Sequence, residues 1–267
     1  MIKKLSMALM AAAMMSACAG QNSSEILSQD SQSGVVGGEK VNMVSPIARS
    51  TVGLFDEMTG SLCTGTLISS QLILTAAHCV VPGSHDLLVF FTQDFNDMNA
   101  YNSRYALKAL QHEDFDNSKK QDRADIALVR ITGDLPAGYA PAPLYGDFKN
   151  LQAGTETVVA GYGVSSAWIG NKSGVLRTTN LTIKAAQFGK TELMMAQSTR
   201  KGVCQGDSGG PAYIQKDGKL YLAAVVSRGD ALDLGITAKC PNNSIYSRVD
   251  AYLPWIKKTS EFLMSIR

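Results

Sequence analysis

The stretch Cys204-Gln205-Gly206-Asp207-Ser208-Gly209-Gly210-Pro211 sets one serine among glycines. Because the neighbouring residues are small, a substrate and the backbone can approach the Ser208 hydroxyl closely, which makes Ser208 a candidate nucleophile. A glycine-flanked serine is a weak signal by itself. Its interpretation depends on whether other segments supply a base for the hydroxyl proton and a group that orients this base.

Two further segments contain such groups. Leu74-Thr75-Ala76-Ala77-His78-Cys79 places a histidine beside a cysteine, and Ala124-Asp125-Ile126-Ala127-Leu128-Val129 places an aspartate at the start of an apolar run. A serine hydroxyl is a poor nucleophile at neutral pH, and a histidine, with an ordinary pKa of about 6.5, can take its proton. His78 is therefore the candidate base and Asp125 its orienting acid. Taken singly, they would be interpreted as a buried structural histidine and a strand-capping aspartate.

The segment Val35-Val36-Gly37-Gly38, followed in order by the histidine, aspartate and serine segments, resembles the trypsin/chymotrypsin family of serine peptidases. The resemblance spans about residues 35–256. It implies an all-β fold of two antiparallel six-stranded β-barrels with a C-terminal helix, in which His78 and Asp125 come from the first barrel and Ser208 from the second. It also implies an oxyanion hole made by the backbone N–H groups of Gly206 and Ser208, each usually worth on the order of 10²–10³ in rate. No cofactor and no metal are implied.

The resemblance further assigns a substrate-binding region. Its residues are Gly202 at the base of the primary pocket, Val203, Gly229 and Ser244 on the walls, and Ser227, Arg228 and Gly229 as an edge for the substrate backbone. No carboxylate lies at that base, so burying a substrate Arg or Lys there is disfavoured. We expect cleavage after medium-sized uncharged residues of the Leu, Met, Phe or Tyr kind. Asp230 and Asp233 in the adjoining loop could still reach in, and Arg228 replaces the large aromatic residue usual in relatives.

Val35 matches the new N-terminus of activated relatives, whose ammonium pairs with the aspartate beside the nucleophile, here Asp207. We therefore expect a zymogen that is cut between Gly34 and Val35. Gly34 is not the basic residue that trypsin-like activators cut after, so the activator is either another peptidase or this enzyme at an atypical site. The alternative is a spacer that is never processed.

The five cysteines support export into an oxidising compartment. Setting Cys18 aside leaves four cysteines, which predict two disulfides with three possible connectivities. No C-x-x-C pair is present, which disfavours a zinc site. The family resemblance implies the pairs Cys63–Cys79 and Cys204–Cys240. A closed loop of this size stabilises a protein by roughly 3 kcal/mol in the entropy model.

The N-terminal segment has the pattern of a bacterial export signal. A basic pair precedes the apolar run Leu5–Met15, which is shorter than the roughly 20 residues that a membrane-spanning helix needs. Met15-Ser16-Ala17-Cys18 resembles a lipobox, so we expect a lipoprotein-type signal over 1–18, acylation of Cys18 and a flexible leader over 19–34. Ordinary signal cleavage is the alternative. Either way the protein is expected to be exported, as an outer-membrane lipoprotein or in the periplasm or extracellular space.

The remaining chain, 35–267, is expected to be one peptidase domain with barrels over about 35–143 and 144–250. The chain has 267 residues, 24 Gly and 8 Pro, and short apolar runs between turns, a pattern typical of β-barrels. The expected strands include Thr66–Thr75, Leu87–Phe91, Ile126–Ile131, Thr157–Ala160, Leu181–Ala185 and Leu220–Val226. Pro136–Pro143 is expected to connect the barrels.

A single helix is expected over about 251–263. Asp250 is the expected cap and Pro254 is expected in the first turn. The apolar stripe that would pack on the barrels consists of Leu253, Ile256, Phe262 and Leu263.

Other polar residues have simpler interpretations. Asp122 could in principle replace Asp125, but it does not match the family pattern. His85 and His112 are expected in solvated or surface turns. The group Asp94, Asp97 and Asn99 would suit either a calcium ion or an ordinary polar loop.

The sequence therefore predicts an exported serine endopeptidase that acts on proteins or peptides. The balance of 25 basic and 23 acidic residues, with a net charge of +2, disfavours nucleic acid as a partner. An activating peptidase is a possible partner, and membrane contact is expected only through a lipid at Cys18. The alternatives are a catalytically silent binding protein on the same fold and a lipid-anchored adhesin. The sequence has no repeat or exposed aromatic array that favours the adhesin.

Overall fold

The computed structural model describes residues 35–81, 86–164, 173–198, 200–230, 240 and 242–266. The expected signal peptide 1–18 with Cys18, the leader 19–34, His85 and Asp233 lie outside the described residues.

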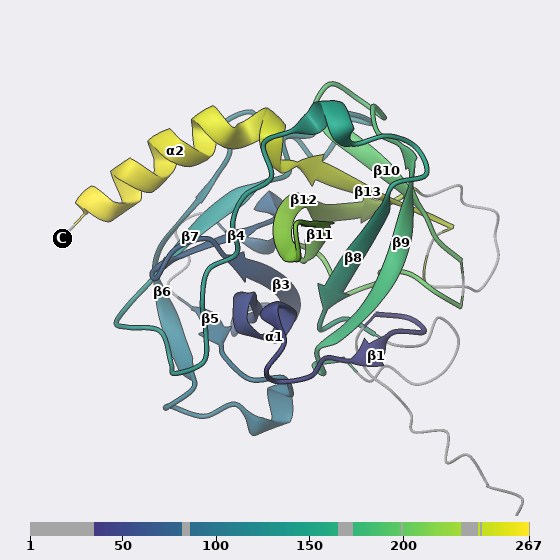
Figure 1. Ribbon diagram of the computed structural model, residues 1–267. Helices are drawn as coiled ribbons and strands as arrows, with labels where there is room; N and C mark the ends of the chain where they lie inside the picture. Colours follow the sequence, from purple (N-terminus) through teal and green to yellow (C-terminus); the bar gives the residue numbers. More distant parts are fainter. Residues whose placement is uncertain are drawn as a thin grey trace, which may run out of the picture. The chain divides into compact units, whose positions relative to one another are not determined.

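Six strands in the first half of the domain close into an antiparallel barrel, blue to teal in Figure 1. They are β2 (Thr51–Asp56), β3 (Ser61–Leu67), β4 (Leu72–Thr75), β5 (Leu87–Phe90), β6 (Ser103–Gln111) and β7 (Ala127–Ile131). The order around the barrel is β2-β3-β4-β7-β6-β5, and β5 pairs with β2 to close it. Aliphatic side chains such as Leu54, Ile73 and Val89, each 0% exposed, fill the interior.

Six strands of the second half form another closed antiparallel barrel. They are β8 (Glu156–Gly161), β9 (Arg177–Ala185), β10 (Glu192–Ala196), β11 (Pro211–Lys216), β12 (Lys219–Gly229) and β13 (Asn243–Arg248). Because β8 pairs with both β9 and β11, the ring β8-β9-β10-β13-β12-β11 closes. The short strand β1 (Glu39–Lys40) adds to the edge of β9. The prediction of two six-stranded antiparallel barrels is confirmed.

The proline-rich segment Pro136–Pro143 lies between β7 and β8 and connects the two barrels. It is held on the first barrel because the N–H of Ala142 donates to the carbonyl of Leu67 over 2.9 Å. The chain then reaches the second barrel, where the N–H of Tyr145 donates to the carbonyl of Leu222 over 2.9 Å. Prolines suit such a connection because they lack the N–H that a sheet ladder requires.

The strand expected over Thr66–Thr75 is two strands in the structure. β3 ends at Leu67 and β4 begins at Leu72, and between them the Ser69 hydroxyl accepts hydrogen bonds from the N–H groups of Gln71 and Leu72. Local side-chain bonding by a serine thus turns the chain inside an apolar run. The apolar runs named from the sequence do not cover β1, β2, β6, β10, β11 or β13.

The C-terminal helix α2 (Val249–Ser265) begins earlier than expected. Its N-cap is Arg248, so the predicted cap Asp250 is wrong; this carboxylate lies in the first turn and binds the Arg248 guanidinium. The early start also moves Pro254 beyond the first turn, into the helix interior, which corrects the second expectation. Phe262 is 55% exposed and does not join the buried stripe, whereas Ile256 and Leu263 do.

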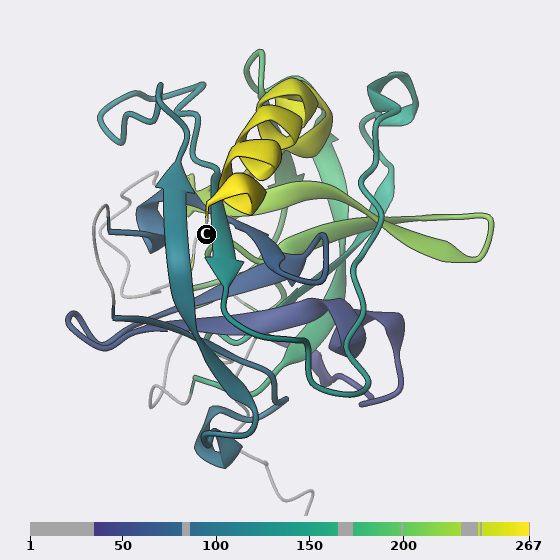
Figure 2. The same cartoon turned by 90° about the vertical axis from the view of Figure 1, so that its left-hand side faces the viewer.

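The helix α2 follows the last strand of the second barrel and packs against β7 of the first barrel as well as β12 of the second. Figure 2 views the first barrel from its side and shows α2 beside β7. Tyr252, Ile256 and Leu263 join a core that consists mainly of residues of the first barrel, and the Arg130 guanidinium of β7 donates to the carbonyl of Leu263 over 2.7 Å. The remaining helical segments are short: α1 (Pro46–Ser50) and the 3₁₀ turns η1 (Ala77–Cys79), η2 (Phe95–Asp97) and η3 (Phe148–Asn150).

Candidate active site

The structure brings His78 and Asp125 into direct contact. His78 lies in η1, which one residue separates from the end of β4, and Asp125 lies two residues before the start of β7, the neighbour of β4 in the barrel. The Nδ1 atom of His78 lies 2.8 Å from Oδ2 of Asp125, and the backbone N–H of His78 donates to Oδ1 over 3.0 Å. The carboxylate therefore holds both the ring and the backbone of the histidine.

Exposure falls from the histidine to the aspartate. The His78 side chain is 29% exposed and the Asp125 side chain is 3% exposed. Burial acts to raise the pKa of the Asp125 carboxyl, but hydrogen bonds from His78 and from the Ser227 hydroxyl, together with attraction to His78, hold it below its ordinary value. Asp125 is therefore an ionised acceptor at neutral pH.

The Ser227 hydroxyl is a second partner of the same carboxylate. Ser227 lies near the end of β12, and its Oγ donates to Oδ2 of Asp125 over 2.6 Å. The Ser247 hydroxyl of β13 donates to the Asp125 carbonyl over 2.8 Å. Two strands of the second barrel thus hold an acid that belongs to the first.

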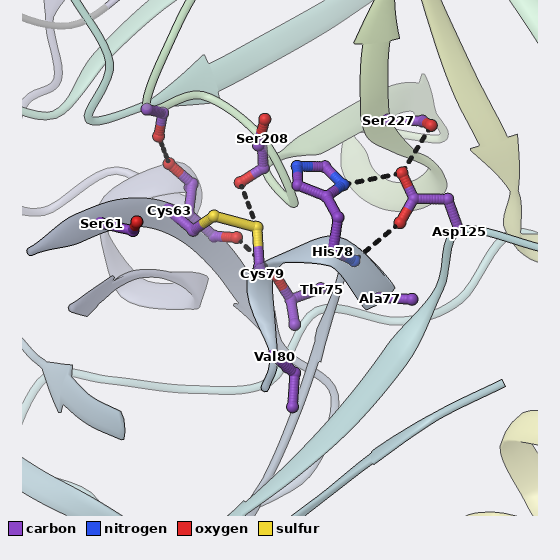
Figure 3. The surroundings of a disulfide bond; sticks show 12 residues. Ser61, Cys63, Thr75, Ala77, His78, Cys79, Val80, Asp125, Ser208 and Ser227 are labelled. Carbon is purple, nitrogen blue, oxygen red and sulfur yellow. Dashed lines mark hydrogen bonds and ion pairs between the residues drawn. A yellow bond between two sulfur atoms is a disulfide. The ribbon is translucent and has the colours of Figure 1, made fainter. Parts of the chain in front are cut away.

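Ser208 lies on the other side of the imidazole from Asp125 (Figure 3). It comes from the loop that precedes β11 of the second barrel. Its carbonyl accepts a hydrogen bond from the N–H of Thr64 over 2.8 Å and contacts the Sγ atom of Cys79 at 3.6 Å. Since Cys79 follows His78 directly, these contacts fix the serine backbone beside the histidine segment.

The turn before Ser208 leaves two backbone donors unpaired. Within the described part of the chain, the N–H groups of Gly206 and Ser208 have no protein acceptor, whereas the N–H of Asp207 donates to the Cys204 carbonyl. Gly206 has a φ of 92°, a backbone conformation that favours glycine. The Thr64 hydroxyl donates to the Gly206 carbonyl over 2.9 Å and so holds this conformation. Two neighbouring unpaired N–H groups can stabilise a negatively charged oxygen.

Asp207, between Gly206 and Ser208, is completely buried. Its carboxylate accepts backbone hydrogen bonds from Cys204 and Gly163, each over 2.8 Å, and another from Val35. Burial nevertheless raises the pKa of Asp207 to about 7, although these three donors act to lower it.

Both disulfides implied by the resemblance are present and lie next to the site. Cys63–Cys79 joins β3 to the histidine segment, and Cys204–Cys240 holds the start of the serine segment. Cys63, His78 and Cys79 also have the proximity of a metal-binding group, but the disulfide occupies both sulfur atoms.

The residues expected around the substrate lie near this site. Gly229 of β12 is paired with Ser244 of β13, and the Ser244 hydroxyl donates to the Tyr246 hydroxyl over 3.2 Å. The Gln197 amide binds both backbone groups of Val203 over 3.1 Å, and a Cβ atom on Gly202 would lie 2.7 Å from its side chain. A neutral amide therefore lies beside the expected base of the primary pocket.

Two alternative residues have other partners. Asp122 does not contact His78; its Oδ1 accepts from the N–H and the hydroxyl of Thr191. His112 begins a turn, as expected, because its carbonyl accepts from the N–H of Phe115 over 3.0 Å. Its side chain is not on the surface, since it is 11% exposed and its ring contacts those of Tyr252 and Trp255. Burial by α2 lowers the pKa of His112.

The polar residues in and around η2 form hydrogen bonds within their own loop. Asp94 accepts from the N–H and the side-chain amide of Asn96, and the Asn99 amide donates to the Asp97 carbonyl. The polar-loop interpretation accounts for these residues.

Sequence reasoning missed three residues that support the site: Thr64, the Ser227 hydroxyl as a partner of Asp125, and Glu192. Thr64 and Glu192 lie in strands that give no local signal. Ser227 was expected only to bind substrate.

Known proteins are similar to this chain over most of its length. The model of the family described as trypsin matches residues 35–256. Human kallikrein-11 is 30% identical over 248 residues, covering 85% of this chain and 83% of that protein. Serine protease 28 of Mus musculus is 27% identical over 220 residues, covering 73% of this chain and 76% of that protein.

Proposed function

Because the chain belongs to the trypsin family and is a serine endopeptidase, we propose that Ser208, His78 and Asp125 form its catalytic triad. The observation that carries this proposal is the 2.8 Å contact between Nδ1 of His78 and Oδ2 of Asp125, with Ser208 on the other side of the ring. An ionised Asp125 accepts a hydrogen bond from Nδ1–H of His78, which keeps the ring proton on Nδ1 and leaves Nε2 free to accept a proton from Ser208.

The reaction follows from this tautomer. The Ser208 oxygen attacks the substrate carbonyl while its proton passes to Nε2 of His78, and the imidazolium is stabilised by Asp125. His78 then gives the proton to the leaving amine, and an acyl-enzyme forms on Ser208. Water releases the acyl group by the same steps, with His78 again as base. The N–H groups of Gly206 and Ser208 bind the oxyanion that develops in each half.

We infer that the primary specificity is for medium-sized uncharged side chains. The Gln197 amide beside Gly202 is neutral, so a buried Lys or Arg of a substrate would have no charged partner there. Ser244 lies opposite Gly229 in the sheet, and its side chain makes the pocket narrower than a glycine at position 244 would. Cleavage of a peptide library dominated by Arg or Lys before the scissile bond would contradict this inference.

We also propose that the protein is made as a zymogen and cut before Val35. Val35 is fully buried and has a φ of 30°, which is unfavourable for a β-branched residue, and its N–H already faces Asp207. Cleavage removes the preceding carbonyl, which relieves this strain, and converts the N–H into an ammonium. The ammonium would then neutralise a carboxylate that burial disfavours. Another peptidase or the enzyme itself would make the cut.

We also propose that the protein is exported. Two observations support this: the two disulfides, which persist in oxidising compartments, and the signal pattern of residues 1–18. None of the described helices is long and apolar enough to cross a membrane. A lipid on Cys18 is proposed as the anchor. Ala19 after Cys18 resembles the sorting signal of outer-membrane lipoproteins and favours that membrane; release into the periplasm or the medium is the alternative. Mass spectrometry of the mature N-terminus tests acylation and cleavage before Val35 together.

A tagged fluorophosphonate tests the triad. We expect the matured protein to be labelled on Ser208, with no labelling of Ser208→Ala and full labelling of Ser61→Ala, a control at an exposed serine of β3. A folded, matured protein that is not labelled at Ser208 would overturn the assignment and favour the silent binding protein.

A further inference from the structure

A buried ion pair lies next to the Asp125 carboxylate and has no part in the steps described above. Arg228 of β12 binds Glu192 of β10 through two hydrogen bonds, Nη1 to Oε1 over 2.6 Å and Nη2 to Oε2 over 2.9 Å. The Glu192 side chain is 0% exposed and the Arg228 side chain 12%. Such a pair is costly to bury and has little value for stability alone, so its position calls for an explanation.

The arginine determines the direction of a hydrogen bond at the site. Nη1 of Arg228 lies 3.2 Å from Oγ of Ser227, and a guanidinium can only donate. Ser227 must therefore accept from Arg228 and keep its own proton for Asp125, which lies 2.6 Å away. A chain of hydrogen bonds therefore runs from Glu192 through Arg228 and Ser227 to Asp125, and it ends at Nδ1 of His78.

The glutamate holds the segment that leads into Asp125. Its carboxylate accepts the N–H of Asp122 over 3.0 Å and the N–H of Arg123 over 3.3 Å. Asp122 and Ala124 both have a φ of 52°, in the left-handed region that is unfavourable for alanine in particular. Such a backbone persists only when its surroundings hold it, and Glu192 supplies two of the hydrogen bonds that do so.

We propose that Glu192 and Arg228 are positioning residues for Asp125, with Glu192 fixing the backbone that carries the acid and Arg228 directing the Ser227 proton onto it. This inference rests on the proposed role of Asp125 in the triad. It extends that role by two residues that touch neither the substrate nor the reacting atoms.

The charges around the pair are balanced. Arg123 interacts with Arg228, Asp125 and Glu192, so two guanidiniums face two carboxylates. The other titratable or charged groups that face this region are His78, Tyr252 of α2, Asp122 with Lys190 beside it, and Asp116 beside Arg123. Removing one member of the pair therefore leaves an uncompensated charge whose sign depends on which member is removed.

This sign provides the test. In Arg228→Met the negative charge of Glu192 remains and favours the protonated imidazole of His78, so the acid limb of the kcat/KM profile moves to higher pH. In Glu192→Gln the positive charge of Arg228 remains, and the acid limb moves to lower pH. In each variant we expect kcat for a small ester to fall about 10- to 100-fold, the loss of one hydrogen bond to a charged group, with KM within about twofold.

Controls separate positioning from folding. All rates are divided by the concentration of sites titrated with a fluorophosphonate, so that unfolded protein does not count. The matched control is Arg248→Met, which breaks another largely buried arginine–carboxylate pair, with Asp250 at 2.7 Å, outside the site. It should lower stability but leave the acid limb in place. The pair variant Glu192→Met with Arg228→Met should return the acid limb towards the wild-type position while kcat stays low.

A readout that needs no turnover keeps this inference distinct from the proposed triad. In Ser208→Ala protein, the proton on Nδ1 of His78 is followed by NMR, and we expect Arg228→Met to shift its resonance and Arg248→Met to leave it. Failure of the wild-type protein to label or hydrolyse overturns the triad and leaves this measurement intact. Acid limbs that stay in place or move in the same direction in both single variants, with an unshifted Nδ1 proton, overturn the positioning role.

Discussion

The carboxylate of Asp207 accepts a hydrogen bond from the backbone N–H of Val35, and both residues are 0% exposed. The start of the domain is thereby joined to the residue beside Ser208. Burial raises the pKa of Asp207 to about 7 while the donor is an uncharged N–H.

In the uncleaved chain, Asp207 should make stability fall as the pH rises. An acid whose pKa is raised on folding, from 3.8 to about 7, contributes stability that is present below pH 3.8 and is lost as the pH rises towards 7. Three pKa units correspond to about 4 kcal/mol of unfolding free energy. We expect Asp207→Asn to remove most of this loss, measured by denaturant unfolding at several pH values in Ser208→Ala protein, which cannot cut itself.

A chain beginning at Val35 is the control for that experiment. Its ammonium would compensate the ionised carboxylate, so its stability should not fall between pH 4 and 7 as that of the uncleaved chain does. Parallel pH profiles for the two forms would count against the Val35–Asp207 switch. Equal turnover of a small ester by the uncleaved and the cleaved forms of the protein that retains Ser208 would contradict it directly.

Gly206→Ala should abolish most activity. Gly206 has a φ of 92°, and an added Cβ would lie 2.7 Å from the Cα atom of Gly163, so the turn must move its N–H groups. We expect kcat to fall about 10²-fold or more, the loss of one oxyanion donor. Gly218→Ala is the matched control, with a φ of 71° but no atom within 4 Å of the new Cβ. Its kcat should be unchanged, and an equal loss in both variants would point to general backbone strain.

Removing either disulfide should destabilise the folded protein. The pairs close loops with sequence separations of 16 and 36 residues, for which chain entropy predicts a loss of about 3 kcal/mol or slightly more. Double Cys→Ser variants of each pair, made in Ser208→Ala protein, are compared by denaturant unfolding. A loss below about 1 kcal/mol for either pair would contradict the prediction.

Asp125→Asn should reduce kcat by roughly 10⁴-fold, the size of the effect in this family's triad. The amide of an asparagine would donate to Nδ1 of His78 and leave the ring proton on Nε2, where it cannot accept from Ser208. Asp217→Asn, at an exposed turn between β11 and β12 with a φ of 51°, is the control and should keep wild-type kcat. Retention of more than about a tenth of the activity by Asp125→Asn would be evidence against the acid's role.

Much of the fold and the candidate triad could be predicted from short segments. The turn at Gly206, the histidine beside Cys79 and the aspartate ahead of an apolar strand each depend on a few neighbouring residues. For that reason they can be recognised in the sequence. The structure contains the two barrels, both disulfides and the His78–Asp125 contact that were expected. The helix cap was predicted incorrectly because aspartate is a common N-cap residue. In the structure the helix begins at Val249, and the Asp250 carboxylate inside its first turn binds the Arg248 guanidinium.

Only the tertiary structure decided which distant groups meet at Asp125. Glu192, Ser227 and Arg228 lie on strands whose register places them together, and a shift of one residue would point each side chain to the opposite face of its sheet. The burial of His112 also depends on tertiary structure, because α2 crosses from the second barrel to the first and covers the His112 ring with Tyr252 and Trp255. Local sequence determines what a turn or a nucleophile segment can do, whereas the closure of two barrels determines which charges are buried beside it.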